Sequence, residues 1–275
     1  MDKNKKQELM DHINGLKLHA PLNLVATAPN SPSKENPLPE KPPQPASGRT
    51  PSSGAKLINN AIVFFADSSL SEELKNDVQH SLLFSQLAAN HALKNSHETN
   101  DDETSQLIWF DEVKGVLGKI GWIQEGVDRG EVQYEVESLD LSKLVLDVLK
   151  GLGGISVGNL SSWKRVLAGV ETLAQNVKQL NIFGKVQKEY GDAHTELGTV
   201  DFKDDTVHLL LTNVAMKGKA KDNNFLIFEF SSDTKTTYHE TLRLRFDETV
   251  YAIGRDLIFT RISGYVKSSI QDIQI

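Results

Sequence analysis

All nine prolines of this 275-residue chain lie between Pro21 and Pro51. Proline fixes φ and removes a backbone donor, so it interrupts helices and sheets when it falls inside them. Residues 18–54 are also rich in Ser, Asn, Lys and Glu and have almost no apolar periodicity, which is typical of a disordered tether. We therefore predict a disordered Pro-rich tail over residues 1–54 and a single folded domain over residues 55–275.

One short segment of the tail has helical character. Residues 3–16 place their apolar side chains on one face, and these are Leu9, Met10, Ile13 and Leu16. An isolated helix of this length is marginal in water. We expect it to form only where it finds a partner.

Charge divides the chain in the same way. The tail holds 7 Lys/Arg and 5 Asp/Glu, and the body holds the remaining 23 and 32, so the tail carries +2 and the body −9 of the total −7. A negative body repels phosphate backbones, so we expect no nucleic-acid partner. The absence of cysteine excludes disulfides, thiolate metal sites and S-acylation.

The first residues do not resemble a secretory signal peptide. Charged residues follow Met1 closely and no apolar core comes after them. We expect the protein to be cytoplasmic when it is made, and to leave the cell by a leaderless route if it acts outside.

Two apolar periodic segments flank the glycine-rich run of residues 151–158 and together span residues 141–180. Their apolar residues recur at three- and four-residue intervals, which predicts a central helical hairpin. The residues of its first arm that we select for contact with a membrane or a protein partner are Leu144, Val145, Val148, Leu149 and Leu152. The alternative is an ordinary core hairpin whose apolar stripe packs inward.

Helical patterns precede most of the strand patterns. Ser69 and Glu72 have capping-box spacing before a helix predicted over residues 70–94, and a second predicted helix over residues 110–120 ends at Gly121. Alternation predicts a strand at 132–136 and antiparallel strands at 206–216, 225–230 and 242–246. Asp247 is expected to cap a closing helix that reaches Ile262. This order favours an α+β fold.

Residues 154–158 read Gly-Ile-Ser-Val-Gly and match the G-x-S-x-G elbow of serine hydrolases. The partners that could complete a Ser, acid, His order are Asp192, Asp201, His208 and His239. No apolar strand ends at the first glycine, and no glycine-rich oxyanion loop precedes it. We interpret Ser156 as part of an interhelical turn, and a serine hydrolase that uses Ser156 stays as an alternative.

No other motif predicts chemistry. The glycine run lacks the Lys-Ser/Thr pair of a P-loop and the G-x-G-x-x-G register, and the eight histidines include no pair at HExxH spacing. We therefore expect no cofactor and no metal.

Several segments together resemble a bacterial family of virulence factors of the Evf type. They run from residue 62 to residue 122, and the segments that carry the likeness are Phe64-Phe65-Ala66, Asp77-Val78, residues 82–90 (LLFSQLAAN), Trp109-Phe110 and residues 116–122 (VLGKIGW). A fainter likeness continues to the closing helix. The resemblance implies a compact α/β or α+β body and a role in persistence in, or toxicity toward, a host. Members of that family are lipid-modified on a cysteine, which this chain lacks.

These observations favour a non-enzymatic, host-directed virulence or toxin-like effector that acts on a host membrane or a host protein. Two other classes remain: the serine hydrolase, and a structural or adaptor protein whose residues 1–54 dock into a secretion or assembly partner.

Overall fold

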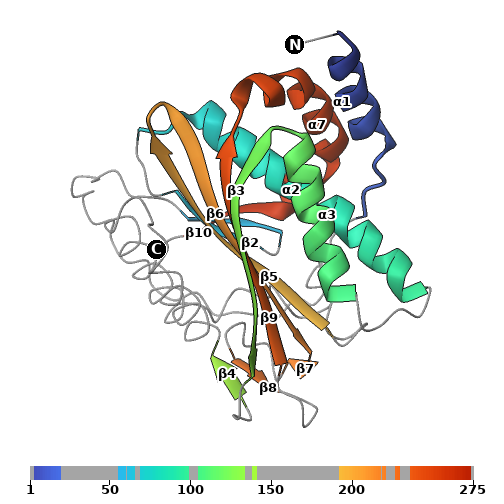
Figure 1. Cartoon of the computed structure of the whole chain (residues 1–275), viewed down its shortest axis with the longest axis vertical. Coiled ribbons are helices and arrows are strands. Elements are labelled where there is room, and N and C mark those ends of the chain that lie inside the picture. Colours follow the sequence, from blue (N-terminus) through green and yellow to red (C-terminus); the bar gives the residue numbers. More distant parts are fainter. Residues whose placement is uncertain are drawn as a thin grey trace, which may run out of the picture.

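The computed structural model describes residues 3–19, 55–59, 61–65, 69–98, 105–133, 138–140, 192–217, 219–220, 227–229 and 236–273. Within them, helices lie on one side of a twisted sheet, as Figure 1 shows. The helices are α1 (Lys3–Gly15), α2 (Glu72–Glu98), α3 (Ser105–Lys119) and α7 (Glu248–Ser269).

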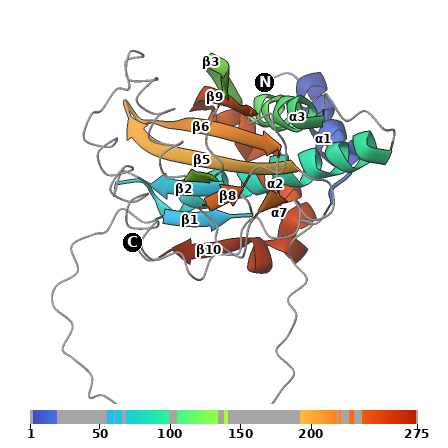
Figure 2. The same ribbon diagram turned by 90° about the horizontal axis from the view of Figure 1, so that it is seen from below.

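Seven strands form the main sheet in the order β10-β1-β2-β5-β6-β9-β3, which Figure 2 shows from below. They are β1 (Ala55–Ile58), β2 (Ala61–Phe65), β3 (Trp122–Gln133), β5 (Asp192–Lys203), β6 (Thr206–Lys217), β9 (Thr236–Phe246) and β10 (Ile270–Ile273). A second sheet has the order β4-β8-β7, with β4 (Ser138–Asp140), β7 (Lys219–Ala220) and β8 (Ile227–Glu229).

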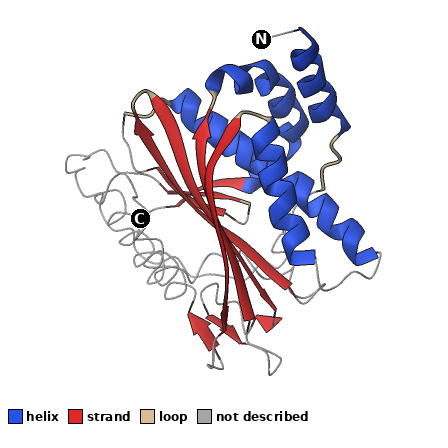
Figure 3. Ribbon diagram, viewed as in Figure 1, coloured by secondary structure: helices blue, strands red, loops and turns tan. Residues whose placement is uncertain are grey.

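Together these elements confirm the predicted α+β class, and Figure 3 separates the helices from the strands by colour. The long helix, the second helix, the strand at 206–216 and the closing helix are confirmed as α2, α3, β6 and α7. The predicted cap is also confirmed, because the Asp247 side chain accepts a hydrogen bond from the Val250 backbone N–H at 3.1 Å. The predicted hairpin of residues 141–180 lies outside the described residues.

One strand begins earlier than expected. The strand predicted at 132–136 begins at Trp122 and is described as far as Gln133, and the earlier part was missed because Gly126 and Gly130 interrupt the alternation that marks a strand. The guanidinium of Arg243 and the ring of His239 lie over these two glycines, where a Cβ would fall less than 3 Å from them. The strands predicted at 206–216 and 242–246 pair antiparallel as expected, in β6 and β9, whereas β5, which was not predicted, pairs in parallel with β2.

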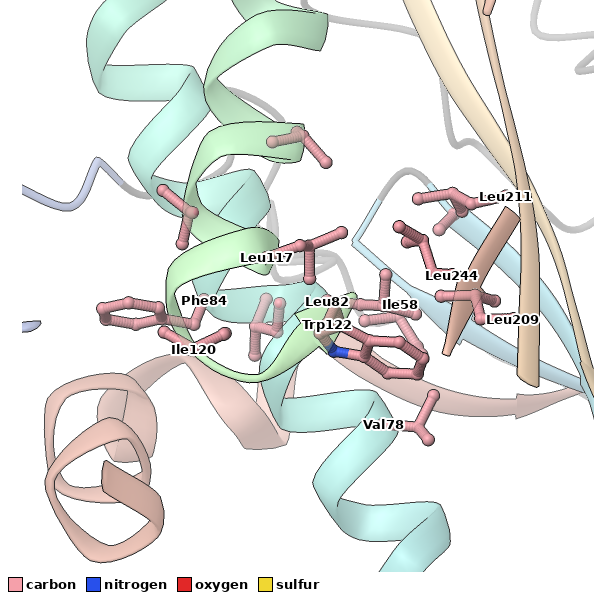
Figure 4. Close-up of a cluster of buried hydrophobic side chains, with 14 of the residues drawn as sticks. Ile58, Val78, Leu82, Phe84, Leu117, Ile120, Trp122, Leu209, Leu211 and Leu244 are labelled. Atoms are coloured by element: carbon pink, nitrogen blue, oxygen red, sulfur yellow. The ribbon is translucent and has the colours of Figure 1, made fainter. Parts of the chain in front are cut away.

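The hydrophobic core fills the space between the helices and the sheet. Val78 and Leu82 of α2, Leu117 of α3 and Trp122 of β3 meet Leu244 there, as Figure 4 shows. Each of these side chains is almost fully buried. The Trp122 indole donates to Ser81 Oγ at 3.0 Å, so even the polar end of the largest core side chain has a partner.

Helix α1 packs on α7, and this corrects the predicted extent of the disordered tail. Leu9 and Ile13 are buried in the core, and the Arg261 guanidinium donates to the carbonyls of Ile13 and Leu16. These bonds satisfy carbonyl groups that a helix end leaves unpaired. Residues 3–19 are therefore part of the body, and residues 20–54 lie outside the described residues.

Gly121 joins α3 to β3 with a φ of +115°, a conformation that side chains rarely adopt. It also touches the start of α7, since the Asp247 N–H donates to the Gly121 carbonyl at 2.7 Å. A Cβ at Gly121 would lie 2.9 Å from the Asp247 carbonyl oxygen. This contact fixes the end of α3 relative to α7.

We expect Gly121→Ala to destabilise the fold by about 2 to 4 kcal/mol, because it combines an unfavourable φ with a backbone clash. Gly118→Ala is the matched control. Gly118 lies inside α3, where an added Cβ meets nothing within 4 Å, so that change should stabilise by about 0.5 to 1 kcal/mol. Urea unfolding measures both changes, and equal effects would contradict this account.

Candidate functional site

One row of residues crosses the sheet on the face that carries the core, and most of its members are polar. The register places Ala61 beside Glu196, Glu196 beside Asn213, Asn213 beside Glu240, and Glu240 beside Arg129. The three central side chains have no solvent exposure. We call Glu196, Asn213, Glu240 and Arg129 the polar row.

The neighbouring rows explain why this row is unusual. Two residues further along each strand, the same face presents Gly198, Leu211 and Leu242, and the next row presents Val200, Leu209 and Leu244. Side chains two apart on a strand share a face. The polar row therefore lies against the helices, where the rows beside it supply apolar contacts.

The distal part of the α2–α3 hairpin lies over the polar row. We call this part the tip and define it as residues 86–98 and 105–114. Gln86 of α2 donates to Glu196, and Lys114 of α3 lies 3.3 Å from Glu240. Asp111 of α3 accepts from Arg129 at 2.9 Å. Three polar contacts thus join the tip to the sheet.

At the other end, the hairpin is attached to the sheet by apolar packing and by the chain itself. Helix α3 ends at Lys119, and only two residues separate it from the start of β3 at Trp122. Ile120 and Trp122 are buried there with Leu82 of α2. The two ends of the hairpin therefore differ, because the attached end is held by apolar packing and by the chain, whereas polar contacts to the sheet accompany the apolar packing at the tip.

Glu196 is fully buried, and burial raises the pKa of its carboxyl group to about 8, although the hydrogen bond from Gln86 acts in the opposite direction. The bond from Gln86 uses one carboxyl oxygen, Oε2. The other oxygen, Oε1, is buried without a hydrogen-bond partner. A carboxyl in this environment is neutral at neutral pH.

Glu240 has a different environment. The Arg129 guanidinium donates to its Oε1 from two nitrogens, at 2.6 and 3.1 Å. Burial alone would raise the pKa of the neighbouring Asp111, but hydrogen bonds from Lys114 and Arg129 lower it. Two cations therefore lie beside Glu240, and their ion pairs offset part of the cost of burying this side chain.

Four buried atoms of the row have no hydrogen-bond partner. They are Glu196 Oε1, both side-chain atoms of Asn213, and Glu240 Oε2. An unsatisfied buried polar group costs about 1 to 3 kcal/mol. The polar row is therefore a weak part of the interface between the tip and the sheet.

The geometry offers little for catalysis, because both carboxyl groups are buried and neither can meet a substrate while the tip is closed. Within the described residues, no group of three or more His, Cys, Asp and Glu side chains could hold a metal ion. What the row can do is change the strength of an interface, because its hydrogen bonds depend on protonation.

The site residues predicted from the sequence are not part of this arrangement. Ser156 lies outside the described residues, as do the selected residues of the first hairpin arm, Leu144, Val145, Val148, Leu149 and Leu152. The polar row was not predicted at all. One signal was available, because Glu240 alternates in phase with Leu242 and Leu244, which face the core.

Comparison with known proteins gives distant matches only. No protein-family model matches the chain, and no curated protein matches it. Among solved structures, the chain is similar to a delta-endotoxin (12% identity, 78% of this chain and 91% of that chain, TM-score 0.38).

Two further structures match the chain. One is of the Evf virulence factor (12% identity, 78% and 82% of the two chains, TM-score 0.31), and the other is of the activated Cyt2Ba monomer from Bacillus thuringiensis subsp. israelensis (10% identity, 59% and 92%, TM-score 0.30). The three matches are a distant resemblance to toxin and virulence proteins. At these scores they do not assign the chain to the Evf-type family, and they say nothing about its activity.

Arg129→Met tests the energetics of the row. We expect a loss of about 2 kcal/mol of unfolding free energy, because Glu240 would stay buried with only Lys114 beside it. Arg245→Met is the control, since Arg245 pairs with Glu125 on the exposed face of the sheet and should cost about 0 to 1 kcal/mol. Urea unfolding compares the two variants. An equal loss of unfolding free energy would show that the Arg129–Glu240 pair in the polar row contributes no more than the Arg245–Glu125 pair.

Proposed function

We propose that this protein is a non-enzymatic, host-directed, toxin-like effector of the Evf type, which acts when the tip of its α2–α3 hairpin lifts from the sheet. The observation that carries the proposal is the polar row. It places incompletely bonded polar groups under the tip, beside the apolar residues that the tip also buries, while the opposite end of the hairpin rests on apolar core and is joined to β3 by the chain. An interface of this kind separates at its polar end first.

Opening of the tip would bring apolar side chains to the surface. The tip holds buried apolar residues from both helices, and these are Leu87, Leu93, Trp109, Phe110 and Val113. Each buried side chain of this size is worth about 1.5 to 3 kcal/mol when it is kept out of water. A lipid interface offers the same gain, so a membrane is a suitable acceptor for the lifted tip.

Binding at the interface fits this hairpin better than crossing the bilayer. In the part of the chain that the structure describes, no helix combines the length and apolar character needed to span a membrane. The aromatic pair Trp109 and Phe110 suits the interface, where aromatic rings lie at the level of the lipid headgroups.

The partners and location that we propose follow from the sequence. The target is a host membrane or a host protein, and no nucleic acid takes part, since the body is acidic. The protein is cytoplasmic when made and is exported by a leaderless route. Residues 1–54 are proposed to contact a secretion or assembly partner.

A cross-link across the tip tests the proposal, and the cysteine-free chain makes it simple to prepare. In Asp111→Cys/Arg129→Cys, a short bismaleimide replaces the 2.9 Å ion pair between α3 and β3. We expect the cross-linked protein to cause no leakage from dye-filled neutral vesicles. The same variant without the linker should cause faster leakage than the unmodified protein, because the tip has lost an ion pair.

The control is a linker that leaves the tip free. In Glu72→Cys/Lys75→Cys the bismaleimide joins two positions that are three residues apart within α2 and replaces the ion pair between them. Because this linker does not join the tip to the sheet, leakage should match that of the unmodified protein. If the protein cross-linked at the tip causes as much leakage as the unmodified protein, opening of the tip is not the mechanism. If the unmodified protein neither binds vesicles nor causes leakage, the membrane is not the target and a host protein takes its place.

A further inference from the structure

Asn213 lies between the two carboxyl groups of the polar row. Gln86 already donates to Oε2 of Glu196. Glu196 Oε1, both side-chain atoms of Asn213 and Glu240 Oε2 are buried without partners, as is Gln86 Oε1. Asn213 has one donor nitrogen and one acceptor oxygen, so when both carboxyl groups are ionised it can donate to only one of them, and its oxygen finds no donor on the other.

A single proton resolves this mismatch. A protonated Glu196 carries an O–H that can donate to Asn213 Oδ1, and Asn213 Nδ2 can then donate to Glu240 Oε2. The series would run from Gln86 through Glu196 and Asn213 to Glu240, which the Arg129 guanidinium already bonds. Neighbouring strands are about 4.8 Å apart, so residues paired in register can make such bonds with small side-chain rotations.

Burial, and not a neighbouring charge, favours this proton. Of the described residues that face Glu196, Ala61 on β2, Asn213 on β6 and Gln86 on α2 are uncharged. Further along the row, the anions Glu240 and Asp111 are paired with the cations Arg129 and Lys114, so these four charges compensate one another. Burial raises the pKa of the Glu196 carboxyl, and the hydrogen bond from Gln86 lowers it.

We propose that Glu196 is a proton latch: its carboxyl stays protonated while the tip of the α2–α3 hairpin covers it, its bond to Asn213 completes the polar row beneath the tip, and deprotonation in alkaline medium favours lifting of the tip, which gives the charge access to water. The latch regulates the opening on which the proposed function rests. An alkaline environment, and not an acidic one, is therefore the condition in which this protein changes shape.

The direction follows from proton linkage. The pKa of Glu196 is raised from its ordinary value of 4.5 to about 8 in the closed state, so the closed state keeps a proton that the open state releases. The stability that Glu196 contributes is complete below its ordinary pKa and is lost as the pH rises through about 8. Between these two values, each pH unit favours opening about tenfold.

Other groups act at lower pH. Burial lowers the pKa values of His12, His80 and His239, so the stability linked to these residues is complete above their ordinary value of 6.5 and is lost as the pH falls below that value through their lowered pKa values. Burial also raises the pKa of Asp77, which bonds to Arg255 away from the row. Experiments between about pH 7 and about pH 9.5 keep the histidines neutral and isolate Glu196.

A distance measurement tests the latch in the full-length protein. Spin labels on Asn95→Cys, at the end of α2, and Lys203→Cys, at the exposed turn of β5, report the separation of the tip from the sheet. We expect the long-distance population to grow as the pH rises toward 8. In Glu196→Gln the neutral amide can donate to Asn213 at every pH, so the tip should stay closed throughout.

Two further variants make the result specific. Gln86→Met removes the hydrogen bond that favours the ionised form of Glu196, so opening should shift to higher pH. Glu8→Gln alters an exposed carboxyl on α1 and should open like the unmodified protein. If Glu196→Gln opens with the same midpoint pH as the unmodified protein, Glu196 is not the latch. If that variant does not fold, an unchanged midpoint in Gln86→Met overturns it instead.

Vesicle leakage, measured over the same pH range, separates this inference from the proposed function. If the tip opens with pH through Glu196 and no vesicle leaks, the latch stands and the membrane role is wrong. If leakage occurs with the same pH dependence in Glu196→Gln, the membrane role stands and the latch is wrong.

Discussion

The structure depends on the burial of α2. From Ser81 to Asn90, every residue of this helix is buried, so α2 has no solvent-facing side over nearly three turns. The sheet, α3 and α7 all pack around it. Small residues such as Ala88 and Ala89 permit close approach, and the other elements take their positions from this helix.

A helix buried on all sides must place its polar side chains inside the protein. Ser81 accepts from the Trp122 indole and Asn90 accepts from the Trp109 indole, each at 3.0 Å, so both polar groups are satisfied by tryptophans that also fill the core. Gln86 is the third case, and its partner is a carboxyl on the sheet, Glu196. Because Gln86 is buried in the middle of α2, it needs a hydrogen-bond partner on the sheet, and Glu196 of the polar row is that partner.

The row is not the most stable solution to that requirement. Replacing buried ionic groups by apolar residues of similar volume is often neutral or stabilising by about 1 to 4 kcal/mol. Leucines at the positions of Glu196, Asn213 and Glu240 would continue the apolar rows beside them, which already hold Leu211 and Leu242. A polar row in that position serves specificity or regulation more plausibly than stability, since unpaired buried groups reduce the free energy of folding.

The helices and the capped start of α7 could be predicted because their signals are local. Apolar periodicity located α2 and α3, and Asp247 and Gly121 marked boundaries through backbone chemistry that neighbouring residues determine. The parallel pairing of β2 with β5 could not be predicted, since it joins segments more than a hundred residues apart. Strand β5 was missed because a buried glutamate and Gly198 occupy the face where apolar residues would mark a strand.

The polar row was missed for a related reason. A glutamate within a strand is normally assigned to the solvent face, and only the register of several strands shows that Glu196, Asn213 and Glu240 are neighbours. The phase of Glu240 with Leu242 indicated that one carboxyl faces inward. It could not indicate that a second carboxyl lies two strands away, or that Gln86 of α2 donates to that second carboxyl.

The contrast between the two ends of the hairpin determines how far a proton can act. One pH unit on a single group corresponds to about 1.4 kcal/mol. Hydrogen bonds to charged groups contribute about 1.5 to 3 kcal/mol each, so the three polar contacts at the tip are of the same order as a shift of a few pH units. The attached end buries Val78, Leu82, Leu117 and Trp122, whose combined burial exceeds that amount several times over. The tip also buries apolar side chains such as Leu87, Leu93 and Trp109, so a change at Glu196 shifts the tip toward opening and a lipid interface that takes up these side chains completes the release. The same change is insufficient to unfold the hairpin, so the molecule can open and keep its fold.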